Sequence, residues 1–414
     1  MPNSEKIYDW IVVGGGISGI TIAEILSRQR KSVLLIEKNA SLASETSKEF
    51  HEWFHSGALY TLVPDDLLTL RYLLGATDDL FEYYKSFPGM NLFPTESGVN
   101  VKSSGWFNQD NIEYKFRVHK FNPIWLSIVS RSISIINMIK KHDWLRRRAG
   151  SEYGKSRVNI SHWFTQIPYQ IRSKSRFLSI SSPDFTMNSR ILISDIISAA
   201  LSSGLDIQLN SKIQTIEDCD DYFKVIGKDQ LHRSKKVVIT SPDAISDILD
   251  IPIKYGYAPM AIAENVGSEI NSFVELDYYP SRCINLLKKD KGIGQIGGIT
   301  LDNENKIGDY LEYIIKEHKS RNPSINILDS YIGVKKELVQ SNQERNYLYH
   351  INQHKENLWS VVLGKFSLAF SMAPEFYRRA YNENPSDTLK TFESKSNHKI
   401  LSKTSWQEIV SKRS

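Results

Sequence analysis

An α/β fold with a second, antiparallel sheet is predicted by three features of this 414-residue sequence. A strand, a glycine turn, a helix and another strand follow one another between residues 7 and 37. Short buried strands return between residues 205 and 240, and longer alternating stretches fill the chain beyond Pro252. Because this length exceeds what one hydrophobic core usually supports, we expect two domains.

The N-terminal segment has the pattern of a βαβ unit. Residues 7–13 are an apolar run typical of a buried strand, and residues 20–28 place apolar side chains at helical spacing. Residues 32–37 predict the second strand, so the unit is complete within about 30 residues.

The rest of the chain alternates between helical and strand patterns. Amphipathic stretches predict helices over 64–87, 121–148 and 188–203, and a short helix over 406–410 in an otherwise loose polar tail. A hairpin is predicted over 212–226 and a buried strand over 235–240. Alternating stretches over 257–264, 273–276 and 284–299 predict the antiparallel sheet, and residues 358–362 a last strand.

Composition excludes several classes of protein. The formal charge of +5 is modest, and 41% hydrophobic residues are ordinary for a globular chain. With only Cys219 and Cys283, neither a disulfide framework nor a clustered cysteine metal site is expected. The first strand begins so early that we expect no signal peptide, and no run is long enough to span a bilayer. A cytoplasmic location is expected.

The glycine turn carries the strongest chemical signal. Gly14, Gly16 and Gly19 match the GxGxxG pattern, which gives a tight turn, close approach of backbone to a pyrophosphate, and close helix packing. The N-terminus of the following helix presents free N–H groups to the phosphates, and Ile17 and Ser18 of the turn are further candidates to contact them. Glu37 ends the second strand, where a carboxylate accepts hydrogen bonds from ribose hydroxyls. A Rossmann-like dinucleotide-binding domain is therefore predicted.

Residues 11–38, Thr46-Ser47 and residues 54–60 resemble the D-amino acid oxidase superfamily of flavoproteins. Within it, the similarity is greatest to the L-2-hydroxyglutarate dehydrogenase and glycerol-3-phosphate dehydrogenase branches. The resemblance implies FAD as cofactor and continues more weakly over 188–217 and 358–374. It implies cofactor contacts at Lys38, Thr46, Ser47, His55, Gly57, Ile213, Gly364, Lys365 and Phe366.

Two loops depart from the family pattern. After the strand ending at Thr240 the chain has Ser241-Pro242 instead of a small-residue turn, and residues 364–367 read Gly-Lys-Phe-Ser instead of a glycine run. If Lys365 faces the flavin N1 and C2 carbonyl region, it stabilises the anionic reduced flavin; otherwise it is a solvent-facing lysine.

The resemblance also implies how the chain is divided. We expect an FAD-binding domain of residues 1–85, 186–250 and 355–385. Residues 86–185 and 251–354 form the expected substrate domain, and residues 386–414 a polar tail.

His55 is the first candidate catalytic residue. By resemblance it lies beside the flavin, where it accepts a hydroxyl proton, forms a covalent link to the flavin, or only supports the backbone. His51 and His55 stand four apart, as a metal-binding pair on a helix does, but without a third ligand no metal site is expected. Arg282, Tyr257 and Tyr349, with Arg345 and Tyr347, are candidates to hold an acidic substrate group.

Three functions remain open. The first is hydride transfer from a CH–OH carbon of a small hydroxy acid or polyol phosphate to flavin N5. The second is oxidation of a CH–NH group on the same fold, and the third is a flavin-binding protein without net redox chemistry. The basic, amphipathic segment 121–148 is either an internal helix or a peripheral membrane contact. The oligomeric state and the electron acceptor are left open.

Overall fold

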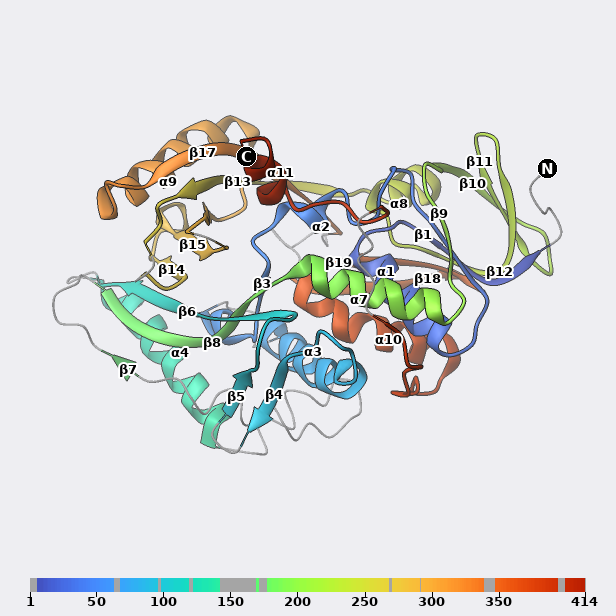
Figure 1. Ribbon diagram of the computed structural model, residues 1–414, viewed down its shortest axis with the longest axis horizontal. Coiled ribbons are helices and arrows are strands. Elements are labelled where there is room, and N and C mark those ends of the chain that lie inside the picture. The colour runs from blue at the N-terminus through green and yellow to red at the C-terminus, as the bar shows by residue number, and fades with distance from the viewer. Residues whose placement is uncertain are drawn as a thin grey trace.

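A computed structural model gives the arrangement of the chain (Figure 1). The residues that it describes are 6–62, 68–95, 98–118, 122–141, 169–170, 177–267, 270–290, 292–338, 347–393 and 399–413.

The first of two large sheets has eight strands within these ranges: β1 (Ile7–Val13), β2 (Val33–Ile36), β9 (Asp206–Gln208), β10 (Ile213–Asp218), β11 (Phe223–Gly227), β12 (Leu231–Ile239), β18 (Tyr349–Lys355) and β19 (Leu358–Leu363). Strands β9, β2, β1, β12 and β19 pair in parallel in that order. The hairpin β10–β11 and strand β18 pair antiparallel to this centre. The predicted βαβ start and hairpin are confirmed.

Helices cover this sheet because its strands are apolar on both faces. Trp10 and Val12 of β1 face a cluster with α1 (Ile17–Arg28), whereas Ile11 and Val13 face a second cluster with α8 (Pro242–Leu249). Further helices on the α1 side are α3 (Leu68–Tyr84), α7 (Ser189–Ser202) and α10 (Ala369–Tyr381). Parallel strands buried on both faces are the usual core of such α/β folds.

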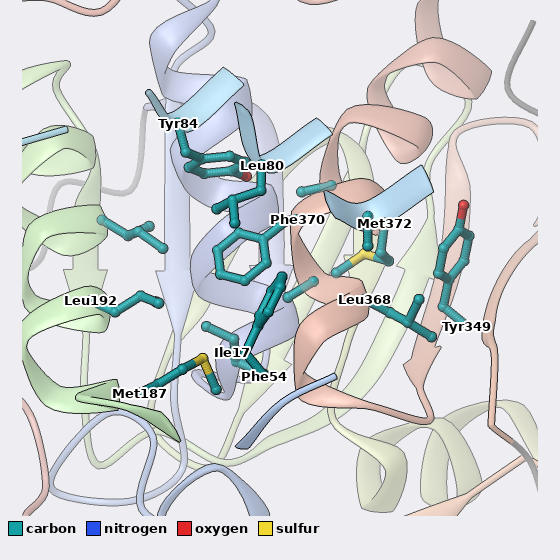
Figure 2. Close-up of a cluster of buried hydrophobic side chains, with 14 of the residues drawn as sticks. Ile17, Phe54, Leu80, Tyr84, Met187, Leu192, Tyr349, Leu368, Phe370 and Met372 are labelled. Carbon is teal, nitrogen blue, oxygen red and sulfur yellow. The ribbon is translucent and has the colours of Figure 1, made fainter. Parts of the chain in front are cut away.

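Large side chains fill the space between these helices and the second sheet. Figure 2 shows Phe54, Leu80 and Phe370 meeting in this cluster, and the rings of Phe54 and Phe370 have centroids 6.0 Å apart. Phe54 belongs to the second sheet and Phe370 to α10, so the cluster joins the two halves of the molecule.

The second sheet has nine strands within the described residues: β3 (Trp53–Phe54), β6 (Phe107–Arg117), β7 (Tyr169–Gln170), β8 (Phe177–Met187), β13 (Lys254–Glu264), β14 (Phe273–Leu276), β15 (Ile284–Lys288), β16 (Gly294–Gly298) and β17 (Asn326–Glu337). Its pairs are antiparallel except for β14 with β6, so the predicted antiparallel sheet is confirmed with one parallel exception. α9 (Ile307–Arg321) packs on β13 and β16.

The remaining elements are short or peripheral. They are α2 (Thr46–Glu49), α4 (Pro123–Lys141), α11 (Ser405–Ser411), a separate hairpin of β4 (Leu92–Thr95) and β5 (Gly98–Val101), and the 3₁₀ turns η1 (Ala58–Leu62), η3 (Pro280–Arg282), η4 (Glu304–Lys306) and η5 (Phe366–Leu368). The part of the 121–148 segment beyond Lys141, Pro64 and Arg345 lie outside the described residues.

The sequence did not decide whether His51 and His55 share a helix. They do not, because Glu52 has a left-handed φ of 56° and the next two residues pair as β3 with β8. The short helix predicted over 406–410 is confirmed as α11, but the expectation of loose residues around it is wrong for residues 399–413. Thr404 caps α11 in a complete capping box, and Leu401 is buried against Leu42.

Candidate functional site

A cavity of about 450 Å³ runs between the two sheets. The glycine turn and Glu37 line one part of it, and residues 364–366, His55 and Tyr347 line another. Strands β13 to β16 of the second sheet form a further wall. A long cavity that joins a Rossmann-like turn to a second domain is where such folds bind cofactor and substrate together.

The glycine turn lets neighbouring backbone segments come into close contact with it. Gly14 has a φ of +118°, and a β-carbon there would stand 2.7 Å from the Ser241 amide nitrogen. A β-carbon on Gly19 would stand 1.9 Å from the Gly14 carbonyl oxygen, so α1 packs directly on the turn. Only glycine fits both positions, because other side chains would collide with backbone.

The N-terminus of α1 opens into the cavity. Gly16 is its N-cap, no side chain caps it, and its first turn contains no acidic residue. Gly16, Ile17 and Ser18 line the cavity, and the Ile17 N–H donates to Ser47 Oγ at 3.0 Å. The positive end of the helix dipole therefore faces space that an anionic group can fill.

Glu37 is buried at the edge of the same space. Its carboxylate accepts from the Gly15 N–H at 2.6 Å and from the Asn39 N–H at 2.8 Å. Burial raises the pKa of Glu37 above its usual value, although these two N–H donors oppose that rise. The carboxylate oxygens keep lone pairs for two further donors, as ribose hydroxyls supply.

Four alternating charges lie beside Glu37. Lys38 and Lys336 each pair with both Glu45 and Asp243, at N–O distances between 2.7 and 2.9 Å. Lys336 comes from β17 of the second sheet and Asp243 from α8 on the first, so this cluster joins the two halves across the cavity. Ser241 and Pro242, where the sequence departs from the family pattern, begin α8. Ser241 is the N-cap of this helix, and Pro242 lies in its first turn.

His55 lies further along the cavity. Its ring stacks on Trp53 with centroids 4.0 Å apart, and Tyr60 meets it edge-on. The pKa of His55 is lowered to about 4, mainly by burial; Asp184 opposes this shift and Lys365 adds to it. The imidazole is therefore neutral at physiological pH, which is the state that accepts a proton.

Comparisons with known proteins agree with this geometry. Residues 9–99 match the sequence profile of the family described as FAD dependent oxidoreductase (DAO). Residues 9–99 belong to that family. No curated protein matches the sequence.

Solved structures of flavoenzymes share the fold over most of the chain. L-amino acid deaminase from Proteus myxofaciens is 12% identical with a TM-score of 0.64, and the match covers 94% of each chain. L-α-glycerophosphate oxidase from Mycoplasma pneumoniae, solved with FAD bound, is 16% identical with a TM-score of 0.61 over 97% of this chain and all of the other. L-proline dehydrogenase from P. horikoshii is 14% identical with a TM-score of 0.61, over 92% and 94%. At this identity the likeness shows the fold.

The protein is thus an FAD-dependent oxidoreductase, and its cavity fits that cofactor. The α1 N-terminus, which opens into the cavity, and the close-packed glycine turn suit a pyrophosphate. Glu37 suits a ribose, and the cavity continues from there to His55 and Lys365. Of the other residues that the resemblance implied, Thr46 and Ser47 at α2, Gly364 and Phe366 also line the cavity.

Lys365 is held between two aromatic rings. Its ammonium lies 5.2 Å from the Tyr60 ring centroid and 5.0 Å from that of Tyr347. Lys335 adds a second ammonium on the same side, where it donates to the Gly364 carbonyl oxygen at 3.1 Å. Both lysines line the cavity, and Lys335 also pairs with the lining residue Glu337 at 3.2 Å, so two ammonium groups and one carboxylate lie at this end of the flavoprotein's site.

Five predicted residues lie away from the cavity lining. Arg282 is exposed on η3 over the Tyr279 ring, and Tyr349 is buried against Tyr72. Tyr257 exchanges backbone hydrogen bonds with Leu301 on the rim of the second sheet. Gly57 has a φ of +108° and packs on Leu70 of α3, and Ile213 belongs to the cluster around α8.

Several lining residues carried no signal in the sequence. Asn285 and Thr300 join His55 at the cavity only through pairing of distant strands and loops, whereas Tyr347, which also lines the cavity, was a candidate from the sequence. Asp184 lies directly behind His55, although 129 residues separate them. A single polar residue in a strand has no spacing pattern that would distinguish it from a surface residue. Within the described residues, no cluster of three metal-ligating side chains occurs and no helix is long and apolar enough to cross a membrane.

Proposed function

We propose that this flavoprotein oxidises a CH–OH carbon of a small, anionic hydroxy acid or polyol phosphate. The observation that carries the proposal is His55, a neutral imidazole beside the cavity with a cationic group, Lys365, in the same region. A neutral base is needed to take the hydroxyl proton, and a cation to attract the acidic group of the substrate.

The chemistry divides between cofactor and protein. FAD, held by the glycine turn and Glu37, would supply the acceptor for the hydride that leaves the substrate carbon. His55 takes the hydroxyl proton at Nε2, because Nδ1 is turned to Asp184 and is closed off from the cavity. Lys335 and Lys365 orient the acidic group by charge, so that the hydroxyl lies against the imidazole. The hydroxyl oxygen keeps the electrons of its broken O–H bond and becomes a carbonyl oxygen.

The apolar part of the cavity lining favours a hydroxy acid over a polyol phosphate within this class. The second sheet and η1 line the cavity with mainly aliphatic side chains. These are Ala258, Val274, Leu276, Ile284, Leu59 and Leu62. Burying a polyol against them would leave hydroxyls without partners, which is costly. An acidic head with an apolar body satisfies both sides of the cavity.

Anaerobic bleaching of the flavin tests the proposal. The holoprotein is mixed without oxygen with 2-hydroxy acids, glycerol 3-phosphate, amino acids and secondary amines, and flavin absorbance is followed. We expect bleaching by 2-hydroxy acids with apolar side chains, and a loss of about 10²–10⁴-fold in its rate in His55→Gln. His232→Gln on β12, away from the cavity lining, is the control.

Oxidation of a CH–NH group is the second candidate. It is supported by the fold shared with an amino acid deaminase and a proline dehydrogenase. Bleaching by amino acids or secondary amines alone would replace the first proposal with this one. No bleaching by any compound would favour the non-redox, flavin-binding alternative.

For location we propose the cytoplasm, since Cys219 and Cys283 are both free thiols.

A further inference from the structure

Asp184 is a fully buried carboxylate on β8. It accepts from the Ser56 N–H at 2.8 Å, the Ser56 hydroxyl at 2.6 Å and the Trp53 indole N–H at 2.8 Å. The Tyr114 hydroxyl also donates to it. Such a set of donors is costly to assemble around a residue with no charge to stabilise.

The pairing of β3 with β8 places this carboxylate beside His55. Trp53 pairs with Thr186 and Phe54 with Phe185. Continuing the register by one residue sets His55 opposite Asp184, and opposite residues of an antiparallel pair share a face. The same alternation puts Trp53 and His55 on one face, where their rings stack.

The carboxylate faces one particular nitrogen of the imidazole. Nδ1 of His55 lies 3.7 Å from Asp184 Oδ2, and it is buried with no hydrogen-bond partner. The backbone of His55 is anchored by its N–H, which donates to Ser367 Oγ at 2.9 Å. The ring is confined between Trp53 and Tyr60. A small rotation of the ring is enough to bring Nδ1 into hydrogen-bonding distance.

Asp184 is charged in this setting. Burial raises the pKa of its carboxyl, but the nearby His55 imidazole and the hydrogen bonds from Ser56 and Tyr114 outweigh burial and hold the pKa below its usual value. The neighbouring His55 is neutral. A carboxylate that only accepts requires a proton on the nitrogen that faces it.

We propose that Asp184 is a positioning residue that holds His55 as the Nδ1–H tautomer, so that Nε2 is the proton acceptor. The proposal rests on the proposed function for the use of Nε2, but the tautomer itself exists without substrate. The buried carboxylate orients the ring and sets which nitrogen carries the proton, as an acidic partner does for a catalytic histidine. If Asp184 served only to satisfy Ser56, Trp53 and Tyr114, the tautomer of His55 would not depend on it.

Nitrogen NMR of the holoprotein, labelled with ¹⁵N-histidine, tests the tautomer directly. His55→Gln assigns the signals of this residue. We expect a protonated Nδ1 and an unprotonated Nε2 in the wild type at neutral pH. A proton on Nε2 in the wild type would overturn the proposal, whatever happens in any variant.

Two variants test whether Asp184 sets the tautomer of His55 or only accepts hydrogen bonds from its other neighbours. Asp184→Asn keeps the size but turns an amide N–H toward Nδ1 or Trp53, so we expect the proton of His55 to move to Nε2. The limiting rate of anaerobic flavin reduction should fall on the order of 10²-fold, with little change in substrate affinity. Ser56→Ala is the control, because it removes one donor and keeps the carboxylate. It should leave the tautomer unchanged.

The outcomes distinguish this proposal from the proposed function. If Asp184→Asn keeps both the wild-type tautomer and the wild-type rate, the positioning role is refuted. If the tautomer depends on Asp184 but His55→Gln reduces flavin as fast as the wild type, the positioning stands and the catalytic use of His55 fails. Should Asp184→Asn not retain FAD, the wild-type spectrum alone decides.

Discussion

The indole N–H of Trp406 donates to the carboxylate of Glu52 at 2.9 Å. Trp406 lies on α11 near the C-terminus, and Glu52 lines the cofactor cavity just before β3. The same carboxylate accepts from Lys289 at 2.9 Å and from the Ser189 backbone N–H at 2.9 Å. Helix α11 therefore helps to hold Glu52, a residue of the cavity lining, in place. Figure 1 shows α11 beside α2.

Trp406→Phe is expected to weaken both the fold and FAD retention. It removes a donor to a buried charge, which typically costs about 1.5–3 kcal/mol. Glu52 would then hold the loop before β3 less firmly. Chemical denaturation and the Kd for FAD measure the two effects, with Lys412→Ala, exposed at the end of the same helix, as the control. Equal FAD retention in both variants would show that α11 plays no part in the site.

Glu37→Ala is expected to raise the Kd for FAD. We propose that this carboxylate accepts from the ribose hydroxyls, and a hydrogen bond to a charged group contributes about 1.5–3 kcal/mol, or about 10- to 100-fold in affinity. Quenching of flavin fluorescence on titration into apoprotein gives the Kd. Glu217→Ala on β10, exposed and away from the cavity lining, controls for charge. An unchanged Kd in Glu37→Ala rules out the ribose contact.

His318 is expected to make the fold sensitive to acid. Burial lowers its pKa to about 3 from an ordinary value of 6.5. The unfolded chain binds a proton below pH 6.5 that the folded chain refuses until about pH 3, so stability falls as pH drops through this window. The slope is at most ~1.4 kcal/mol per pH unit for this group. His318→Leu should lose less stability than the wild type between pH 7 and 5 in chemical denaturation; an equal loss excludes His318 as a cause.

The surface of α4 is expected to bind anionic vesicles. Ile124 and Leu126 are 61% and 45% exposed on a segment that also carries exposed Arg131. Exposed apolar side chains beside a cation are typical of an interfacial helix. Co-sedimentation with phosphatidylserine vesicles should be lost in Ile124→Asp/Leu126→Asp, and vesicles of phosphatidylcholine alone should bind less. No binding to the anionic vesicles removes the membrane contact.

Much of the fold could be predicted from local patterns. The run from β1 to β2 has its strand, glycine turn and helix contiguous in the sequence, so periodicity and turn chemistry identify it directly. The β3 strand could not be predicted in this way. It has two residues, and it exists because β8, more than 120 residues later, pairs with it. Two residues are too few for any period to be visible.

The candidate site also contains residues that local patterns predicted and residues that they did not predict. Gly14, Gly16 and Glu37 were predicted, because the glycine spacing and the acid at the end of the second strand form one contiguous pattern within residues 7–37. The predicted acid-binding residue Arg282 lies on an exposed turn, whereas Lys335 and Lys365 line the cavity. Residue type indicated that a cation is needed, but it could not indicate which cation faces inward.

The sequence by itself determined the dinucleotide turn and the two kinds of sheet, and by resemblance it indicated His55 as a candidate, since these depend on contiguous residues. Only the tertiary structure decided which charges meet. It brought Asp184 to Nδ1 of His55 and Trp406 to Glu52. These contacts join residues more than 100 positions apart, so they depend on strand register and on how the two sheets and the C-terminal helix pack, which no local pattern records.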